Sequence, residues 1–337
     1  EPAAIRKAAR ALRAGRRTLL LLGTPAVRAG LHPLLAGIAA ATGADLMASP
    51  TVSSLPRGRG RLNLPAVPYP VAEAVARLSC YDTLILVNCP PPVGFFRYPG
   101  LPSLVHRPDA DLIVLSRPDQ DAEAALLALA AELGAAPAPV PAVGPAPAHV
   151  DAGPIDPAGF ALRIAGLLPE NAIVVNEALT LGSGFAAAMP HAAPVEWLTV
   201  TGGAIGGGPP LATGAAIGAR AVRRDERRVI NLQADGSAAY TLQALWTQAR
   251  ERLPVVTLLL NNRSYAILQG EYQKVGATPG PTARAMMSLD DPAIDWCRVA
   301  EGLGVAGARV TTHAELDAAF RRALSSEGPT LLDVAFP

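Results

Sequence analysis

The chain has 337 residues, of which 50% are hydrophobic and 17% are charged, and its formal net charge at pH 7 is +1. This balance indicates a folded protein with more than one core, and it argues against intrinsic disorder and against a strongly basic nucleic-acid-binding surface. No apolar run reaches the ~18 residues of a transmembrane helix, so we expect no membrane partner.

The cysteines and histidines show no metal-binding pattern. The three cysteines lie far apart and form no CxxC pair, so neither a zinc site nor a disulfide framework is indicated. Residues 1–17 lack the apolar segment of a signal peptide, and a cytoplasmic location is expected. The five histidines are expected mostly at the surface or in loops: His32, His106, His149, His191 and His313.

The first part of the chain, residues 1–134, alternates short apolar runs with helical patterns. We predict strands at 18–23, 44–49, 82–89 and 110–116, and helices at 71–78 and 120–133. Continuous apolar strands separated by helices are typical of a parallel sheet covered on both faces. The glycines of Gly23–Gly30 lack GxGxxG spacing, which favours a tight turn over a dinucleotide site and a dehydrogenase.

Residues 135–157 are mostly Ala, Pro, Gly and Val. Proline at this density disfavours both helices and sheet ladders, so we predict a semi-rigid linker between two domains. A surface loop within one domain remains the alternative.

The α/β alternation resumes in residues 158–337. We predict strands at 172–178, 228–233, 254–260 and 329–336, and helices at 158–168, 237–250, 291–303 and 314–324. On the helix 237–250, Leu242, Leu245, Trp246 and Ala249 would share one face, and Tyr240 and Trp246 are expected to pack. A glycine-rich stretch covers residues 201–219.

Polar residues follow two strands of one predicted β-α-β unit. Asp235 follows the first strand, and Asn261 and Asn262 follow the second. Because parallel strands joined by one crossover helix lie close together, their carboxyl ends should bring these side chains to one edge, where ligands of α/β sheets bind. Carboxylate and amide oxygens suit Mg²⁺, which also takes oxygens from phosphates. With Gly236 and Ser237, the pattern predicts a site for a metal-bound diphosphate.

This pattern resembles the thiamine motif of thiamine-diphosphate-dependent enzymes of the acetolactate synthase and benzoylformate decarboxylase group. Their Gly-Asp-Gly and Asn-Asn elements stand here as Ala234-Asp235-Gly236 and Asn261-Asn262. The resemblance covers the whole chain. It implies an α/β protein of two domains, each with a mostly parallel sheet flanked by helices: a Rossmann-like middle domain in residues 1–134 and a thiamine-diphosphate-binding domain in residues 158–337.

The resemblance also implies roles for individual residues. Asp235, the side chain of Asn262 and the backbone carbonyl of Ser264 would bind Mg²⁺. Contacts to thiamine diphosphate would come from five residues: Thr180, Gly236 and Ser237 at the diphosphate, the carbonyl of Gly203 at the aminopyrimidine, and Ile205 under the bent cofactor.

Several features depart from the family pattern. The N-terminal pyrimidine-binding domain is absent, and with it the activating glutamate, so no catalytic residue is assigned and the chain is expected to be incomplete. Pro99 follows Phe96-Arg97-Tyr98 where benzoylformate decarboxylases carry a histidine, and Leu268 stands where pyruvate decarboxylases carry a glutamate. The Gly-Met-His-Gly signature of FAD-binding relatives is missing, so FAD is not indicated.

The implied function is decarboxylation or carboligation of a 2-oxo acid, similar to that of acetolactate synthase, with thiamine diphosphate and Mg²⁺ as cofactors. The alternatives are a decarboxylase of the benzoylformate type that does not ligate, and a non-catalytic cofactor-binding module. The implied partners are a small 2-oxo acid and either further copies in a dimer or tetramer or a separate chain with the pyrimidine domain.

Overall fold

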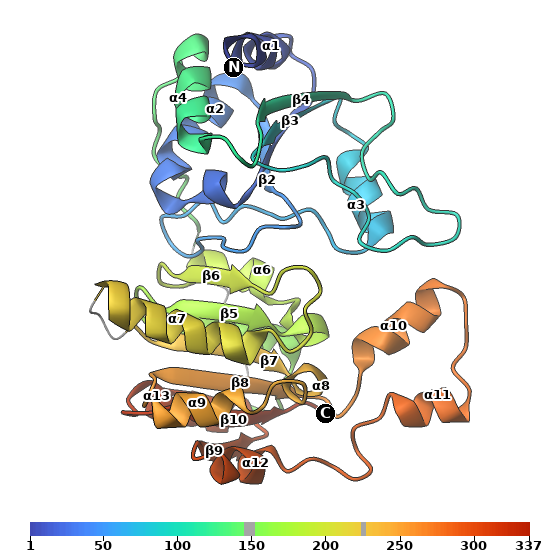
Figure 1. Cartoon of the computed structure of the whole chain (residues 1–337), viewed down its shortest axis with the longest axis vertical. Coiled ribbons are helices and arrows are strands. Elements are labelled where there is room, and N and C mark those ends of the chain that lie inside the picture. The colour runs from blue at the N-terminus through green and yellow to red at the C-terminus, as the bar shows by residue number, and fades with distance from the viewer. Residues whose placement is uncertain (145–151, 224–226) are drawn as a thin grey trace. The chain divides into compact units, whose positions relative to one another are not determined.

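The computed structural model describes residues 1–144, 152–223 and 227–337. The chain divides into two compact units, Glu1–Ala142 (unit 1) and Val143–Pro337 (unit 2). Each unit holds one parallel sheet flanked by helices (Figure 1), which confirms the predicted α/β class. The predicted linker, residues 135–157, stays a prediction because residues 145–151 lie outside the described part of the chain.

Unit 1 has a four-stranded sheet with the order β2-β1-β3-β4, in which every pair is parallel. The strands are β1 (Thr18–Leu22), β2 (Asp45–Ala48), β3 (Thr83–Val87) and β4 (Asp111–Ser116). Leu20 and Leu22 face the core beneath α1 (Pro2–Arg13), α2 (His32–Thr42) and α4 (Ala122–Leu133), whereas Leu19 and Leu21 face the core beneath α3 (Val71–Leu78). Helices on both faces explain why β1 is apolar throughout. The short helices η1 (Thr24–Val27) and η2 (Ala29–Leu31) follow β1.

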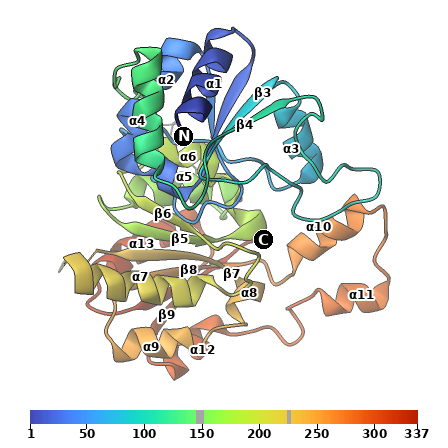
Figure 2. The same ribbon diagram turned by 45° about the horizontal axis from the view of Figure 1, so that its top comes forward.

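Unit 2 has a six-stranded parallel sheet with the order β6-β5-β7-β8-β10-β9. The strands are β5 (Ile173–Glu177), β6 (Glu196–Thr199), β7 (Val229–Ala234), β8 (Val255–Asn261), β9 (Ala306–Val310) and β10 (Thr330–Ala335). One face is covered by α5 (Pro157–Leu167), α6 (Phe185–Ala188) and α13 (His313–Leu324), and the other by α7 (Gly208–Arg223), α9 (Ala244–Arg250) and α12 (Trp296–Gly302) (Figure 2). The short helix η4 (Met189–His191) follows α6.

The predicted helix 237–250 is wrong in its extent. The structure has a short helix α8 (Asp235–Ala238), turns through residues 239–243, and then α9. The Thr241 hydroxyl donates to the carbonyl of Gly206 across 2.6 Å, which holds this segment against the glycine-rich loop. The predicted packing of Tyr240 and Trp246 is also wrong: they are 62% and 51% exposed. Trp246 instead lies under the guanidinium of Arg250.

Other elements lie outside the predicted ones. Helix α7 forms within the glycine-rich stretch, and β6 and β9 are short edge strands without a long apolar run. Helices α10 (Ala266–Lys274) and α11 (Pro281–Met286) project from the body of unit 2 and bury no residues (Figures 1 and 2). Contrary to expectation, His32 and His313 are buried in helices, whereas His106 is buried in a loop; His149 lies outside the described residues.

Candidate cofactor-binding site

The candidate site lies at the carboxyl ends of β5, β7 and β8. The strand order reverses at β5, because β6 pairs on one side of it and β7 on the other. Such a reversal point is where open α/β sheets bind ligands, outside the carboxyl ends of the strands. Asp235 follows β7 directly, Asn261 ends β8, and the neighbouring strands pair in parallel register, so the polar strand ends predicted from the sequence meet at one edge.

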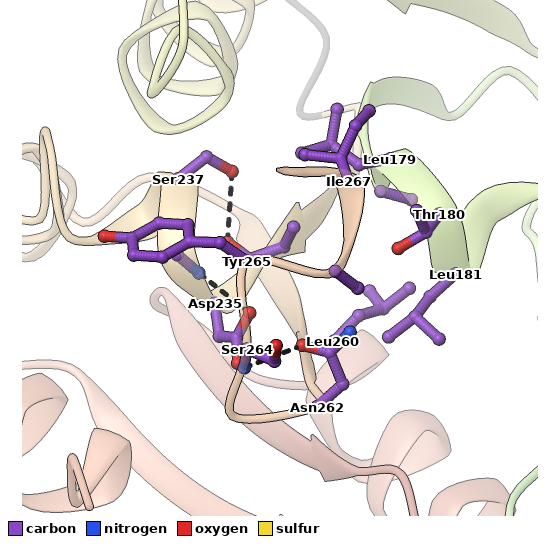
Figure 3. Close-up of a pocket in the computed structure, with 14 residues that line it drawn as sticks. Leu179, Thr180, Leu181, Asp235, Ser237, Leu260, Asn262, Ser264, Tyr265 and Ile267 are labelled. Atoms are coloured by element: carbon purple, nitrogen blue, oxygen red, sulfur yellow. Dashed lines mark hydrogen bonds between the residues drawn. The ribbon is translucent and has the colours of Figure 1, made fainter. Parts of the chain in front are cut away.

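A first cavity, open to solvent, lies at this edge (Figure 3). It is formed by η3 (Leu179–Gly182) with Ala178, by the start of α8 with Ala234, and by the segment after β8. The cavity brings together six of the predicted site residues: Thr180, Asp235, Gly236, Ser237, Asn262 and Ser264. They come from three segments that are distant in the sequence.

Asp235 is the buried carboxylate of this cavity, with 3% of its surface exposed. Its Oδ1 accepts from the N–H of Gly236 across 2.8 Å, and its Oδ2 accepts from the N–H of Arg263 across 2.7 Å. Burial raises the pKa of this carboxyl above its ordinary value, although these backbone N–H groups oppose the shift. Among the described residues no basic side chain forms an ion pair with Asp235. A cation bound beside it would stabilise its charge.

The two asparagines at the end of β8, Asn261 and Asn262, have different surroundings. The side-chain Nδ2 of Asn261 donates to Asp333 Oδ1 across 2.8 Å, and its side-chain Oδ1 accepts from the N–H of Arg263 across 3.2 Å. Asn261 therefore ties the turn to β10. Asn262 lines the first cavity, and its Oδ1 accepts from the N–H of Ser264 across 3.1 Å. Arg263, between Asn262 and Ser264, has φ +55°, a left-handed conformation that reverses the chain there.

Hydrogen bonds hold Ser264 at the wall of the cavity. Its hydroxyl donates to the carbonyl of Met287 across 3.2 Å and accepts from the side-chain amide of Gln269 across 2.7 Å. The Asp235 carboxylate, the Asn262 amide oxygen and the carbonyl expected from Ser264 would together give an oxygen-only donor set, which would suit Mg²⁺. Three protein oxygens leave the remaining positions of an octahedral ion for phosphate and water. The donor chemistry of this cavity thus fits a magnesium diphosphate.

Gly236 and Ser237 lie at the start of α8, and Gly236 packs against the ring of Tyr265. A Cβ atom on Gly236 would lie 2.6 Å from Tyr265 Cε1, so a larger residue here would have to displace the ring. The Ser237 hydroxyl accepts from Gln233 Nε2 across 2.8 Å and donates to the carbonyl of Ala234 across 3.2 Å. Its hydroxyl is therefore already engaged within the chain.

Gly203 and Ile205 do not line the first cavity. They line a second cavity together with Asn176, Glu177, Leu179, Val200 and Ala204. Leu179 borders both cavities and has a left-handed φ of +48°, which is strained for a leucine. The carbonyl of Gly203 accepts from the N–H of Ile205 across 2.9 Å, and the Ile205 side chain is 48% exposed. The predicted site residues thus divide between two neighbouring cavities.

Sequence reasoning missed Glu177 and Gln233. Glu177 ends β5 and is 4% exposed, and Gln233 lies near the end of β7 and is fully buried. Their side chains join across 2.9 Å. Both are polar residues near the carboxyl end of an apolar strand, the same signal that identified Asp235.

Comparisons with known proteins give the relatives of this chain. The family described as "Thiamine pyrophosphate enzyme, C-terminal TPP binding domain" matches residues 179–334. A relative named "Putative acetolactate synthase large subunit IlvX", from Mycobacterium tuberculosis, is 40% identical over 97% of this chain and 62% of its own length. Benzoylformate decarboxylase from Pseudomonas aeruginosa is 32% identical over 58% of this chain and 35% of its own length.

A solved structure extends the likeness to the fold. The thiamine diphosphate-dependent 4-hydroxybenzoylformate decarboxylase of Rhodococcus jostii superposes with a TM-score of 0.80 at 26% identity, over 98% of this chain and 63% of that protein. The chain thus spans less than two thirds of the length of these relatives. Residues 179–334 thus match the C-terminal TPP-binding domain of thiamine pyrophosphate enzymes, and the chain is homologous to proteins named as an acetolactate synthase large subunit and a benzoylformate decarboxylase.

Proposed function

We propose that the chain binds thiamine diphosphate with Mg²⁺ at the carboxyl edge of the unit 2 sheet and serves decarboxylation or carboligation of a 2-oxo acid, as in acetolactate synthase. One observation carries the proposal: Asp235 and Asn262, from neighbouring strands, line one cavity with Thr180, Gly236 and Ser264. The likeness to a protein named as an acetolactate synthase large subunit supports the reaction class.

In this proposal, each cavity holds one part of the cofactor. Asp235, Asn262 and Ser264 hold Mg²⁺, while Thr180, Gly236 and Ser237 contact the diphosphate. Gly203 and Ile205, in the second cavity, hold and bend the pyrimidine end. The bound cofactor would supply the electron sink for loss of carbon dioxide. The chain's own contribution is to hold the metal, the diphosphate and the bent geometry.

A decarboxylase of the benzoylformate type is the second candidate, because two relatives of that type match this chain. Pro99 stands after Phe96-Arg97-Tyr98 and cannot transfer protons, which favours the first candidate. Carbon dioxide release from a panel of 2-oxo acids, with a pyrimidine-binding domain added in trans, separates them. An acyloin product supports carboligation, an aldehyde alone supports the second candidate, and binding without carbon dioxide release supports a non-catalytic module.

Calorimetric titration of the full chain with thiamine diphosphate, with and without Mg²⁺, tests cofactor binding directly. We expect Mg²⁺-dependent binding that Asp235→Asn weakens at least about tenfold, because the variant lacks the anionic ligand. Asp290→Asn is the matched control, since Asp290 is an exposed carboxylate that pairs with Arg263 outside the cavity. Equal affinity in the wild-type chain and Asp235→Asn would refute the metal assignment.

The proposal also covers the oligomeric state and the cellular location of the protein. In this family the cofactor lies between subunits, so we propose a cytoplasmic dimer or tetramer, or a complex with a separate pyrimidine-domain chain. Sedimentation velocity with and without the cofactor tests this part, and a monomer in every condition, with and without added pyrimidine domain, would refute it.

A further inference from the structure

A buried carboxylate at the end of β5 links the two cavities of the proposed site. Glu177 Oε1 accepts from the N–H of Gly206 across 2.7 Å, and its Oε2 accepts from the N–H of Gly208 across 2.8 Å. Oε2 also accepts from Gln233 Nε2 across 2.9 Å. Among the described residues no Arg, Lys or His forms an ion pair with Glu177, so these three donors are what stabilises its charge.

The loop that Glu177 holds is rich in glycine and exposed, and the Thr241 hydroxyl also contacts it, at the carbonyl of Gly206. Gly202, Gly203 and Gly206 have left-handed φ values of +70°, +66° and +82°, and residues 201–205 are exposed. Glycines give such a loop many alternative conformations, so an anchor is needed to select one. The two amides that Glu177 binds follow Ile205 and open α7, where the free N–H groups of the helix favour an anion.

Gln233 carries this anchor to the other cavity. Its Nε2 donates both to Glu177 and to the Ser237 hydroxyl, the latter across 2.8 Å. The connection therefore runs from the glycine-rich loop through Glu177 and Gln233 to the start of α8. It joins Ile205 in the second cavity to Ser237 in the first.

We infer that Glu177 is a positioning residue: its carboxylate fixes the loop that presents Gly203 and Ile205, and Gln233 keeps this loop in register with the diphosphate end of the site. This inference rests on the proposed function for the identity of the ligand. The anchoring itself is a property of the chain without ligand.

Hydrogen exchange of the Gly206 and Gly208 amides in the full chain without cofactor tests the anchor. In Glu177→Gln one carboxylate oxygen becomes an NH₂ group that faces an N–H donor, so we expect these amides to exchange at least about tenfold faster. Amides of β1 and α13 serve as internal controls and should not change. Glu177→Asp keeps both acceptor oxygens and should restore most of the protection, which a general loss of packing would not.

A second variant keeps the test decisive if Glu177→Gln does not fold. Gln233→Met removes the Nε2 that donates to both Glu177 and Ser237. The two amide bonds to Glu177 remain, so we expect the variant to preserve most of the Gly206 and Gly208 protection while weakening thiamine diphosphate binding. Unchanged exchange in folded Glu177→Gln, or unchanged binding in both variants, overturns the inference. If the wild-type chain binds no thiamine diphosphate while exchange responds as expected, the proposed function fails and the anchor stands.

Discussion

The side-chain amide of Asn261 donates to Asp333 Oδ1 across 2.8 Å, and both residues are buried. This bond ties the end of β8 to its neighbour β10. Consecutive side chains at the end of a strand point to opposite sides, so holding Asn261 on one side leaves Asn262 to line the cavity. Of two adjacent identical residues, one therefore stabilises the turn and the other belongs to the candidate site.

Asn261→Asp should destabilise unit 2 by about 2–4 kcal/mol at pH 7, because two buried carboxylates would face each other. Burial already raises the pKa of Asp333, and a second acid would raise it further. An acid with a raised pKa contributes stability at low pH that is lost as the pH rises, so the deficit should be smaller at pH 5 than at pH 7. Urea unfolding of the wild-type chain and the variant at both pH values measures this loss of stability. Asn262→Asp, one residue on and facing the cavity, is the control and should cost less; equal costs would contradict the assignment of the two amides.

Gly208→Ala should lower the free energy of unfolding by about 2–3 kcal/mol, because its Cβ would lie 2.1 Å from Gln233 Oε1 and 2.9 Å from Glu177 Oε2. Gly214→Ala in the same helix is the control. A Cβ there meets nothing within 4 Å, and the change should stabilise the helix by about 0.5–1 kcal/mol. Thermal unfolding of both variants checks the prediction, and similar effects at the two positions would show that the contacts of Gly208 do not matter.

Gly236→Ala should cost about 1–2 kcal/mol through the clash of its Cβ with the Tyr265 ring. A double-mutant cycle isolates this contact: in the Tyr265→Ala background the cost should fall to a few tenths of a kcal/mol. Chemical unfolding of the four proteins measures the coupling. Additive effects would mean that the ring does not limit this position.

The surroundings of His32 predict that the stability of unit 1 depends on pH. Its Nδ1 accepts from the N–H of Leu62 across 3.2 Å, so Nε2 carries the proton toward the carbonyl of Val27, and a second proton would break the first bond. Burial lowers the pKa of this imidazole below its ordinary value of 6.5. The unfolded chain therefore takes up a proton first, and stability should fall by up to about 1.4 kcal/mol per pH unit as the pH drops below 6.5.

Chemical unfolding of unit 1 between pH 7.5 and pH 5 checks this prediction. His32→Gln, which does not titrate, is the control and should show a flatter profile. The same slope in both proteins would assign the pH dependence to other groups.

The core of the fold could be predicted from local patterns. The runs Leu19–Leu22 and Leu258–Leu260 are apolar because helices cover both sheet faces, and short runs of this kind between helical patterns favour buried strands. The edge strands β6 and β9 were missed because one side of an edge strand is less covered and needs less apolar sequence. Helix α7 was missed because its glycines, such as Gly214, obscure the helical pattern although they fit an exposed helix face.

The sequence by itself determined which polar residues end the strands, because Asp235 and the pair Asn261-Asn262 stand out at the ends of two predicted strands. Only the tertiary structure decided how these residues divide their roles. Glu177 meets the amides of Gly206 and Gly208 about 30 residues away, and Asn261 meets Asp333 72 residues away. Such partners are set by the order of strands in the sheet, which depends on how whole elements pack. Local sequence patterns do not show this order.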